Sequence, residues 1–419
     1  MQPRPRTTAP VFTVLKDRDF RAIWYLGGLH EISRRMELLV LSWLILQTTD
    51  SPFQLGLVLV FNNVPRPLFS LFSGFVADRF SRHRILYVAQ TINTLVTAGI
   101  LLLIIREQIA SWHVFLAVFM TGLTKSLEDP SRRTAILDIV GEGRLVNALS
   151  LDQISNTVGK MAGPLLGGIL LDASGFTGAY AFVLAAHILT LGQLTRVKIP
   201  LYQGAISAGP VWHGLSTGVK YAWHNPMLLG MLYITIIMNA LAFPVQQFIP
   251  AIGRDNLGVG ASLVGLLVAA EGVGQLIGAG VMASTRDFQY HGRIFVIGSV
   301  MVLAMVILFV WSPWYALAFI FLTLGGIGQA GFGTMQSSIT MLSAPREMRG
   351  RMMGLMSFCI GVGTPLGTLE IGAVAAAFST QWAISINALA GLFLIIPALA
   401  LTPLVWRPAS PPSPATAQD

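Results

Sequence analysis

The chain has 419 residues, of which 54% are hydrophobic and 11% are charged, and its formal net charge is +8. Soluble domains carry about 25% charged residues, so this composition excludes a soluble globular protein. The apolar residues form runs near the roughly 20 residues that an α-helix needs to cross a bilayer, without the alternation typical of a membrane β-barrel. We therefore predict an all-α membrane protein.

The apolar runs predict twelve transmembrane helices in two halves of six. In the N-terminal half, 20–195, they cover residues 20–47, 54–77, 84–105, 111–129, 145–171 and 176–195. In the C-terminal half, 227–404, they cover residues 227–250, 260–283, 293–311, 314–342, 352–377 and 381–404. The weakly apolar segment 196–226 predicts a cytoplasmic linker, with a short amphipathic helix at 212–224 on the cytoplasmic face.

The ends and loops predict the orientation. Residues 1–19 are basic, contain proline and lack a cleavable apolar core, so we expect a cytoplasmic tail. Residues 405–419 are rich in Pro and Ser and are predicted to be disordered. Almost all Lys and Arg residues outside the spans fall on one side, and only Arg106 and Arg254 fall on the other. Positive residues stay in the cytoplasm, so both termini are predicted to be cytoplasmic in a multi-pass protein of a bacterial plasma (inner) membrane. The net charge then reflects topology and not a nucleic-acid partner.

The first span contains an unusual group of ionisable residues: His30, Glu31, Arg34, Arg35 and Glu37. Such groups are costly in a membrane and usually face the bundle interior or water. Helical spacing allows Glu31 to pair with Arg35, and Arg34 with His30 or Glu37. Two interpretations remain open. The group is a self-neutralised network between helices, or it lines a central cavity where His30, Arg34 and Arg35 bind an anionic substrate group and the two glutamates cycle protons.

Other polar residues in the spans extend the set of candidates. Asn63 and Arg66 in the second span and Gln246 in the seventh are candidate substrate-binding residues. Arg66 stands between two prolines, so it alternatively satisfies backbone carbonyls that those prolines free. Glu271 lies deep in the eighth span without a cation nearby in the sequence. It is a candidate proton-coupling site, or a structural carboxyl bonded to another helix.

The loop after the second span reads GFVADRFSRHRI and contains Gly74, Asp78, Arg79, Arg82 and Arg84. A carboxylate at this boundary can face the N-terminus of a neighbouring helix and pair with the arginines. Such a contact predicts a conformational latch that holds one packing of the two halves. The alternative is an ordinary basic cytoplasmic loop.

This loop resembles the signature of the major facilitator superfamily. Within that superfamily the chain resembles the macrolide and siderophore exporter branch, the transmembrane secretion effector group. The similar stretches are LSWLILQTTDSPFQLGLV, NNVPRPLFSLFSGFVADR, DPSRRTAILDIV and PREMRGRMMGL. The resemblance implies two six-helix halves around a central cavity, a monomer, and secondary transport.

The fifth span contains GKMAGPLLGG, with Gly159, Gly163, Pro164, Gly167 and Gly168. Glycines four residues apart make a flat helix face for close packing, and the proline invites a bend. In the superfamily this pattern resembles the antiporter signature of exporters. Close packing without any role in coupling is the alternative.

Missing motifs narrow the function further. The sequence contains no G-x-x-x-x-G-K-[ST] phosphate loop, so we expect no ATP-driven step, and no enzyme, cofactor or metal motif is found. We predict a secondary active transporter that exports a small organic molecule (a drug, a siderophore, or a polar or anionic metabolite) by proton-coupled antiport and alternating access. Its expected partners are the small molecule, protons and the lipid bilayer. The alternatives are uptake or exchange of a small organic anion, and a non-transporting membrane sensor or assembly factor.

Overall fold

The computed structural model describes residues 11–65, 81–141, 144–195, 211–284, 290–345 and 348–407. Almost all of these residues are helical, which confirms the all-α prediction. Eight helices in the described ranges are long and apolar enough to cross a membrane.

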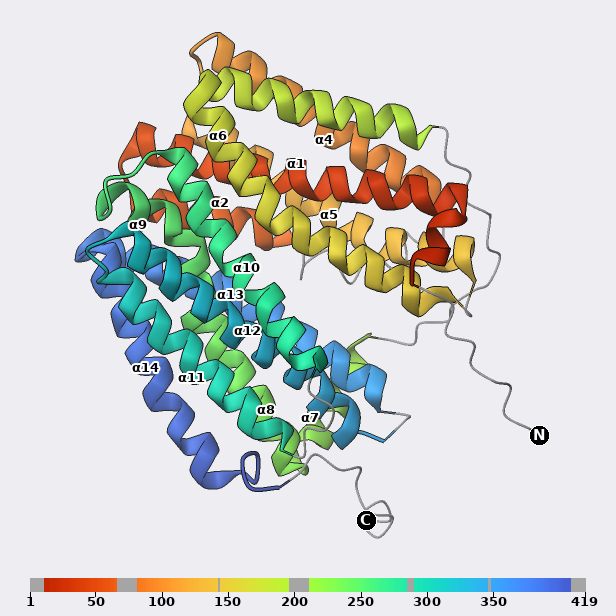
Figure 1. Cartoon of the computed structure of the whole chain (residues 1–419), viewed down its shortest axis with the longest axis vertical. Coiled ribbons are helices and arrows are strands. Elements are labelled where there is room, and N and C mark those ends of the chain that lie inside the picture. Colours follow the sequence, from red (N-terminus) through yellow and green to blue (C-terminus); the bar gives the residue numbers. More distant parts are fainter. Residues whose placement is uncertain are drawn as a thin grey trace.

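The first group of helices surrounds α1 (Figure 1). It comprises the 3-10 helix η1 (Val11–Lys16), α1 (Arg18–Thr49), α2 (Pro52–Asn63), α4 (Arg82–Ile105), α5 (Ser111–Val140) and α6 (Leu145–Leu194). Asp17 begins α1 as its N-cap, because its side chain accepts from the backbone N–H groups of Asp19 and Phe20. Asp50 ends the helix in the left-handed conformation, with φ of 48°.

The helix α6 folds back on itself at Gly175, which has φ of 66° and ψ of −172° inside the 50-residue element (Figure 1). Glycine adopts positive φ without a steric penalty. The predicted spans 145–171 and 176–195 therefore correspond to two antiparallel segments of α6.

The helix α5 is longer than the predicted span 111–129, because it continues to Val140. The apolar run stops where Arg132 and Arg133 begin, but charged residues with long side chains are good helix formers. The end of an apolar run therefore does not mark the end of a helix. The extension places Arg132 and Asp138 beside neighbouring helices.

The second group follows the linker (Figure 1). It comprises α7 (Val211–Trp223), α8 (Pro226–Ile237), the π-helix η3 (Met238–Ala242), the 3-10 helix η4 (Phe243–Phe248), α9 (Ile249–Asp255), α10 (Ala261–Ser284), α11 (His291–Val310), α12 (Tyr315–Ser343), α13 (Arg349–Ala377) and α14 (Thr380–Leu401). The helix predicted at 212–224 is confirmed as α7. The span predicted at 227–250 is not one regular helix, because π and 3-10 turns interrupt it around Pro244, which lacks a backbone donor.

Glycines bring the two groups into close contact. A Cβ atom at Gly56 of α2 would lie 3.4 Å from the Cα atom of Gly372 of α13. Gly168 of α6 packs against the backbone of Ala261, and Gly265 of α10 packs against the backbone of Pro164. Small residues of this kind let membrane helices approach closely, and α6 and α10 thereby form one wall of the space between the groups.

Candidate functional site

A cavity of about 180 Å³ lies between the two groups. Residues from α1, α6, η4, α9 and α10 line it: Arg35, Leu38, Leu39, Ser42, Lys160, Pro164, Gln246, Gln247, Pro250, Val268, Glu271, Gly272 and Gln275. The lining contains two cations from the first group, one carboxyl from the second and several amides. This combination suits reversible binding of a polar, charged small molecule.

Glu271 is held by amide side chains. Its Oε1 atom accepts from the Nε2 atoms of Gln246, at 2.5 Å, and Gln275, at 2.9 Å. Gln275 also donates to Oε1 of Gln329. The structure thus brings together Gln246 and Glu271, which the sequence marked separately as candidates for substrate and proton binding.

Arg35 and Lys160 face the same cavity from α1 and α6. Arg35 also approaches a carboxylate of its own helix, because its Nε atom lies 3.8 Å from Oε2 of Glu31. Lys160 is not among the substrate-binding or proton-coupling residues predicted from the sequence. Asp152, two turns before Lys160 in α6, pairs with Arg132 of α5.

Glu31 is the centre of a buried ionic cluster. Its carboxylate lies 2.7 Å from Nη2 of Arg34, 3.8 Å from Arg35 and 3.9 Å from Nζ of Lys125 in α5. Arg34 therefore pairs with Glu31, and not with the residues that helical spacing also allowed. Glu31 does not line the central cavity but joins α1 to α5.

His30 points away from the central cavity. Its Nε2 atom lies 3.1 Å from Oε2 of Glu128 in α5. Both residues line a second, smaller cavity of about 60 Å³ enclosed by α1, α4, α5 and α6. His30 and Arg34 are therefore less directly placed for substrate than Arg35.

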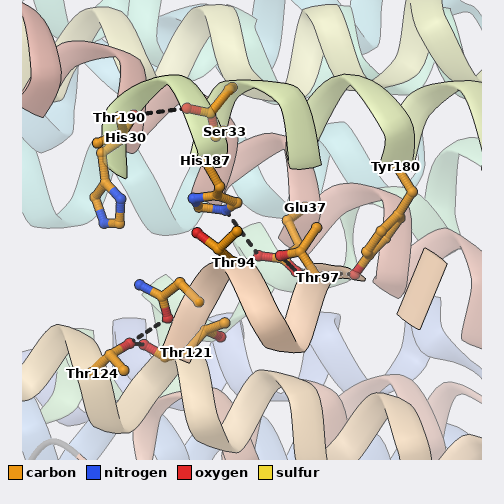
Figure 2. Close-up of polar contacts among 12 residues, drawn as sticks. His30, Ser33, Glu37, Thr94, Thr97, Thr121, Thr124, Tyr180, His187 and Thr190 are labelled. Carbon is orange, nitrogen blue, oxygen red and sulfur yellow. Dashed lines mark hydrogen bonds and ion pairs between the residues drawn. The ribbon is translucent and has the colours of Figure 1, made fainter. Parts of the chain in front are cut away.

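Glu37 lies in the interior of the first group and is only 3% exposed. Its Oε1 atom accepts from the hydroxyls of Thr97, at 3.2 Å, and Tyr180, at 3.1 Å. His187 lies on its other side, with Nε2 4.0 Å from Oε2 (Figure 2). Each buried carboxyl oxygen thus faces a polar group, as burial in a membrane interior requires.

Gln90 fixes the orientation of the His187 ring. The Nε2 atom of Gln90 lies 3.1 Å from the carbonyl oxygen of His187 and 3.0 Å from its Nδ1 atom. A carbonyl only accepts, so the amide nitrogen of Gln90 is the donor in both contacts. Nδ1 is then the acceptor, and in the neutral ring the proton is on Nε2, which faces Glu37.

The remaining polar candidates of the second span and the following loop are dispersed. The Nδ2 atom of Asn63 donates to the carbonyl of Leu59 in its own helix, at 2.8 Å. Arg82 forms an ion pair of 2.9 Å with Asp138 of α5, and Arg84 is exposed. The other candidates lie outside the described residues: Arg66, Gly74, Asp78 and Arg79.

The glycine motif of α6 packs against α1. A Cβ atom at Gly159 would lie 2.8 Å from Cβ of Glu31, and one at Gly163 would lie 2.6 Å from Cβ of Arg35. At Gly167 the nearest atom would be Cγ of Met36, at 3.1 Å. Together with Gly168, which packs against Ala261 of α10, these glycines hold α6 close to both α1 and α10, and Pro164 lines the central cavity.

Comparisons with known proteins identify the family of this chain. Residues 9–409 match the sequence model of a family described as transmembrane secretion effector. The chain is 24% identical over 331 residues to the enterobactin exporter EntS of Shigella flexneri, covering 78% of each chain, and 23% identical over the same length to EntS of Escherichia coli O1:K1.

Solved transporters share the fold. A bacterial homologue of the human lysosomal transporter Spinster, in an inward-facing and unoccupied conformation, superposes with a TM-score of 0.71 at 15% identity, covering 94% of this chain and 96% of that one. A mutant of the nucleoside transporter NupG gives a TM-score of 0.74 at 15% identity, covering 92% of this chain and 100% of that one.

Proposed function

This chain belongs to the transmembrane secretion effector family, and from this premise we propose that it exports a small organic molecule in exchange for protons. It is a transporter of the major facilitator type in the bacterial inner membrane, and its family and relatives are transporters and not enzymes. Export is supported by the relatives that are named exporters, at 23–24% identity. Proton exchange is supported by the carboxyl of Glu271 in the cavity.

The proposed topology has twelve spans and cytoplasmic termini. The N-terminal six are α1, a span that begins with α2, α4, α5 and the two segments of α6. The C-terminal six are the unit from α8 to α9, and then α10, α11, α12, α13 and α14. The halves cover residues 20–195 and 227–404, joined by the linker 196–226, in a protein that works as a monomer. The split of Lys and Arg residues between the loops supports this orientation.

One observation carries the proposal: the cavity lies at the seam between the two groups, with Glu271 on one side and Arg35 on the other. Transporters of this architecture bind substrate near the midplane and rock one half against the other. Exchange requires that proton and substrate favour opposing states, because a ligand that binds both states equally shifts neither. Glu271 and Gln246 contribute directly to this site, whereas Glu31 and Glu37 act from inside the N-terminal half.

The test uses purified protein in liposomes. A thermal-shift screen over organic anions, siderophores and drugs identifies a ligand, and flux of that ligand is then followed under an imposed pH gradient together with the internal pH. We expect substrate-dependent proton movement opposite to substrate, which falls to the level of empty liposomes in Glu271→Gln. Glu107→Gln, in an exposed loop, is the matched control. Intact proton-coupled flux in both Glu271→Gln and Glu31→Gln contradicts the proposal.

Uptake or exchange of a small organic anion is the second candidate, favoured by the two cations in the cavity lining. The same liposomes separate the two functions. Anion and proton that move in the same direction support uptake. Tight binding without flux supports a sensor.

A further inference from the structure

Lys160 is a cation in the cavity lining that no carboxylate of the described residues contacts directly. It is on α6, one turn before Pro164, and lines the cavity together with Glu271 of α10. The two helices are in close contact here, since Gly272, the residue after Glu271, packs against the side chain of Met161. Lys160 and Glu271 therefore lie on facing edges of two helices that belong to different halves.

The ammonium group of Lys160 has no direct partner in the part of the chain that the structure describes: no hydrogen bond and no ion pair links it to another described residue. Arg35, the other cation of the cavity, shares the carboxylate of Glu31 with Arg34 and Lys125. Lys160 interacts electrostatically with Glu271 across the cavity, without a direct contact. A cation within a membrane that no carboxylate contacts directly is costly, so a site of this kind attracts an anionic group from outside the protein.

Glu271 provides the opposite sign. The charged residues that face it are Lys160 of α6 and Arg35 of α1. The other groups around it are neutral amides: Gln246 of η4, Gln275 of its own helix and, through Gln275, Gln329 of α12. Its carboxyl remains accessible from the cavity, so both a proton and a ligand reach it.

Whether a ligand binds together with the proton or competes with it restricts the class of substrate. A simple anion at Lys160 withdraws the cation that neutralises Glu271, so that anion and proton bind together. This linkage gives co-transport. A cationic N–H group that binds the Glu271 carboxylate competes with the proton, and competition is the linkage that exchange requires.

We propose that Lys160 and Glu271 together bind a small zwitterion, whose anionic group contacts Lys160 and Arg35 and whose ammonium group replaces the proton on Glu271. This inference rests on the proposed proton exchange and adds the class of substrate. A zwitterion spans the seam, because its two charges are bound by different halves. It also explains why the cavity contains both signs of charge.

The experiment compares three probes of similar size on the purified full-length protein: 4-(aminomethyl)benzoate, a zwitterion; 4-methylbenzoate, an anion; and 4-methylbenzylamine, a cation. Calorimetric titration in two buffers of different ionisation enthalpy gives the affinity and the number of protons released. We expect the zwitterion to bind most tightly and to release protons. Tightest binding by the anion, accompanied by proton uptake, contradicts the proposal, and so does absence of zwitterion binding at millimolar concentration.

Variants test which residue binds each of the two charges of the zwitterion. Lys160→Gln is expected to lower the affinity for the zwitterion and the anion by about tenfold or more, since it removes one charge-assisted contact. The affinity for the amine is expected to stay the same. Lys160→Arg restores most of the affinity for the zwitterion, and Lys220→Gln, which removes an exposed lysine of α7, leaves it unchanged. Glu271→Gln is expected to abolish proton release and amine binding. Thermal unfolding of each variant establishes that it is folded.

The outcomes distinguish failure of the zwitterion site from failure of the proposed proton antiport. If Lys160→Gln binds the zwitterion with unchanged affinity, the zwitterion site is rejected. If a ligand from the screen still drives proton exchange in that variant, the proposed antiport is retained. Proton release that persists in Glu271→Gln rejects the zwitterion site, and proton-coupled flux that also persists in Glu31→Gln rejects the antiport.

Discussion

Two glutamates of the same type have different surroundings in this structure. Glu37 is enclosed in the N-terminal half by hydroxyl donors and an oriented histidine. Glu271 faces a cavity, and its hydrogen bonds to described residues come from amides of its own half. The first arrangement fixes a carboxyl in place, and the second leaves it open to a ligand. Burial alone therefore does not distinguish a structural carboxyl from a functional one.

Tyr180→Phe tests the structural role of the Glu37 network. The change removes the hydroxyl that donates to Glu37 and leaves the ring in a fully buried site. Removal of a hydrogen-bond donor from a buried carboxyl costs about 1–3 kcal/mol, so we expect a lower unfolding temperature in detergent. Tyr233→Phe, whose hydroxyl has no hydrogen bond to the described residues, is the control. Equal stability of the two variants speaks against the network.

At the scale of elements, the sequence predicted the helices well, because apolar runs directly report the length of a span. It missed the extension of α5, where the helix continues through charged residues such as Arg132. It singled out Glu271 because no cation is nearby in the sequence, but the partner Gln246 lies on another element. Lys160 was not assigned to the cavity for the same reason: which helix faces which is decided by packing, and a single sequence does not contain that information.

Gly163→Ala tests the packing of α6 on α1. The added Cβ atom would lie 2.6 Å from Cβ of Arg35 and 2.8 Å from the carbonyl oxygen of Ile32. Overpacking of this kind costs about 1–3 kcal/mol, so we expect reduced thermal stability and reduced transport. Gly192→Ala is the matched control in the same helix, because nothing lies within 4 Å of its Cβ position. The packing argument fails if both variants behave alike.

At the scale of the whole molecule, polar contacts join the two halves at one end. Arg254 of α9 donates to the carbonyl of Leu46 and to the carboxylate of Asp50, both at the end of α1. The backbone N–H of Ser262 at the start of α10 donates to Asp172 of α6, at 2.8 Å. Arg254 and Ser262 flank the same short turn, so both contacts lie at one end of the seam. Alternating access requires that these contacts break when that end opens.

Arg254→Ala is expected to favour opening at that end. The Asp50 side chain is 87% exposed, so the contact is worth about 1 kcal/mol and the ratio of the two conformations changes by about fivefold. The substitution Ser42→Cys, at a position that lines the cavity, reports the change through labelling by an impermeant maleimide from either side, in a Cys359→Ser background. Arg106→Ala, predicted on the same side, is the control. An unchanged labelling ratio rules out the role of Arg254.

The mixed charges of the cavity have an electrical consequence. Lys160 and Arg35 are fixed to the protein, and a zwitterion has no net charge, so the proton on Glu271 is the charge that differs between the two loaded forms. Each exchange of one zwitterion for one proton then moves one elementary charge across the bilayer. A potential of 100 mV contributes about 2.3 kcal/mol per charge. In the proposed exchange, voltage would therefore power export in addition to acidity outside the cell.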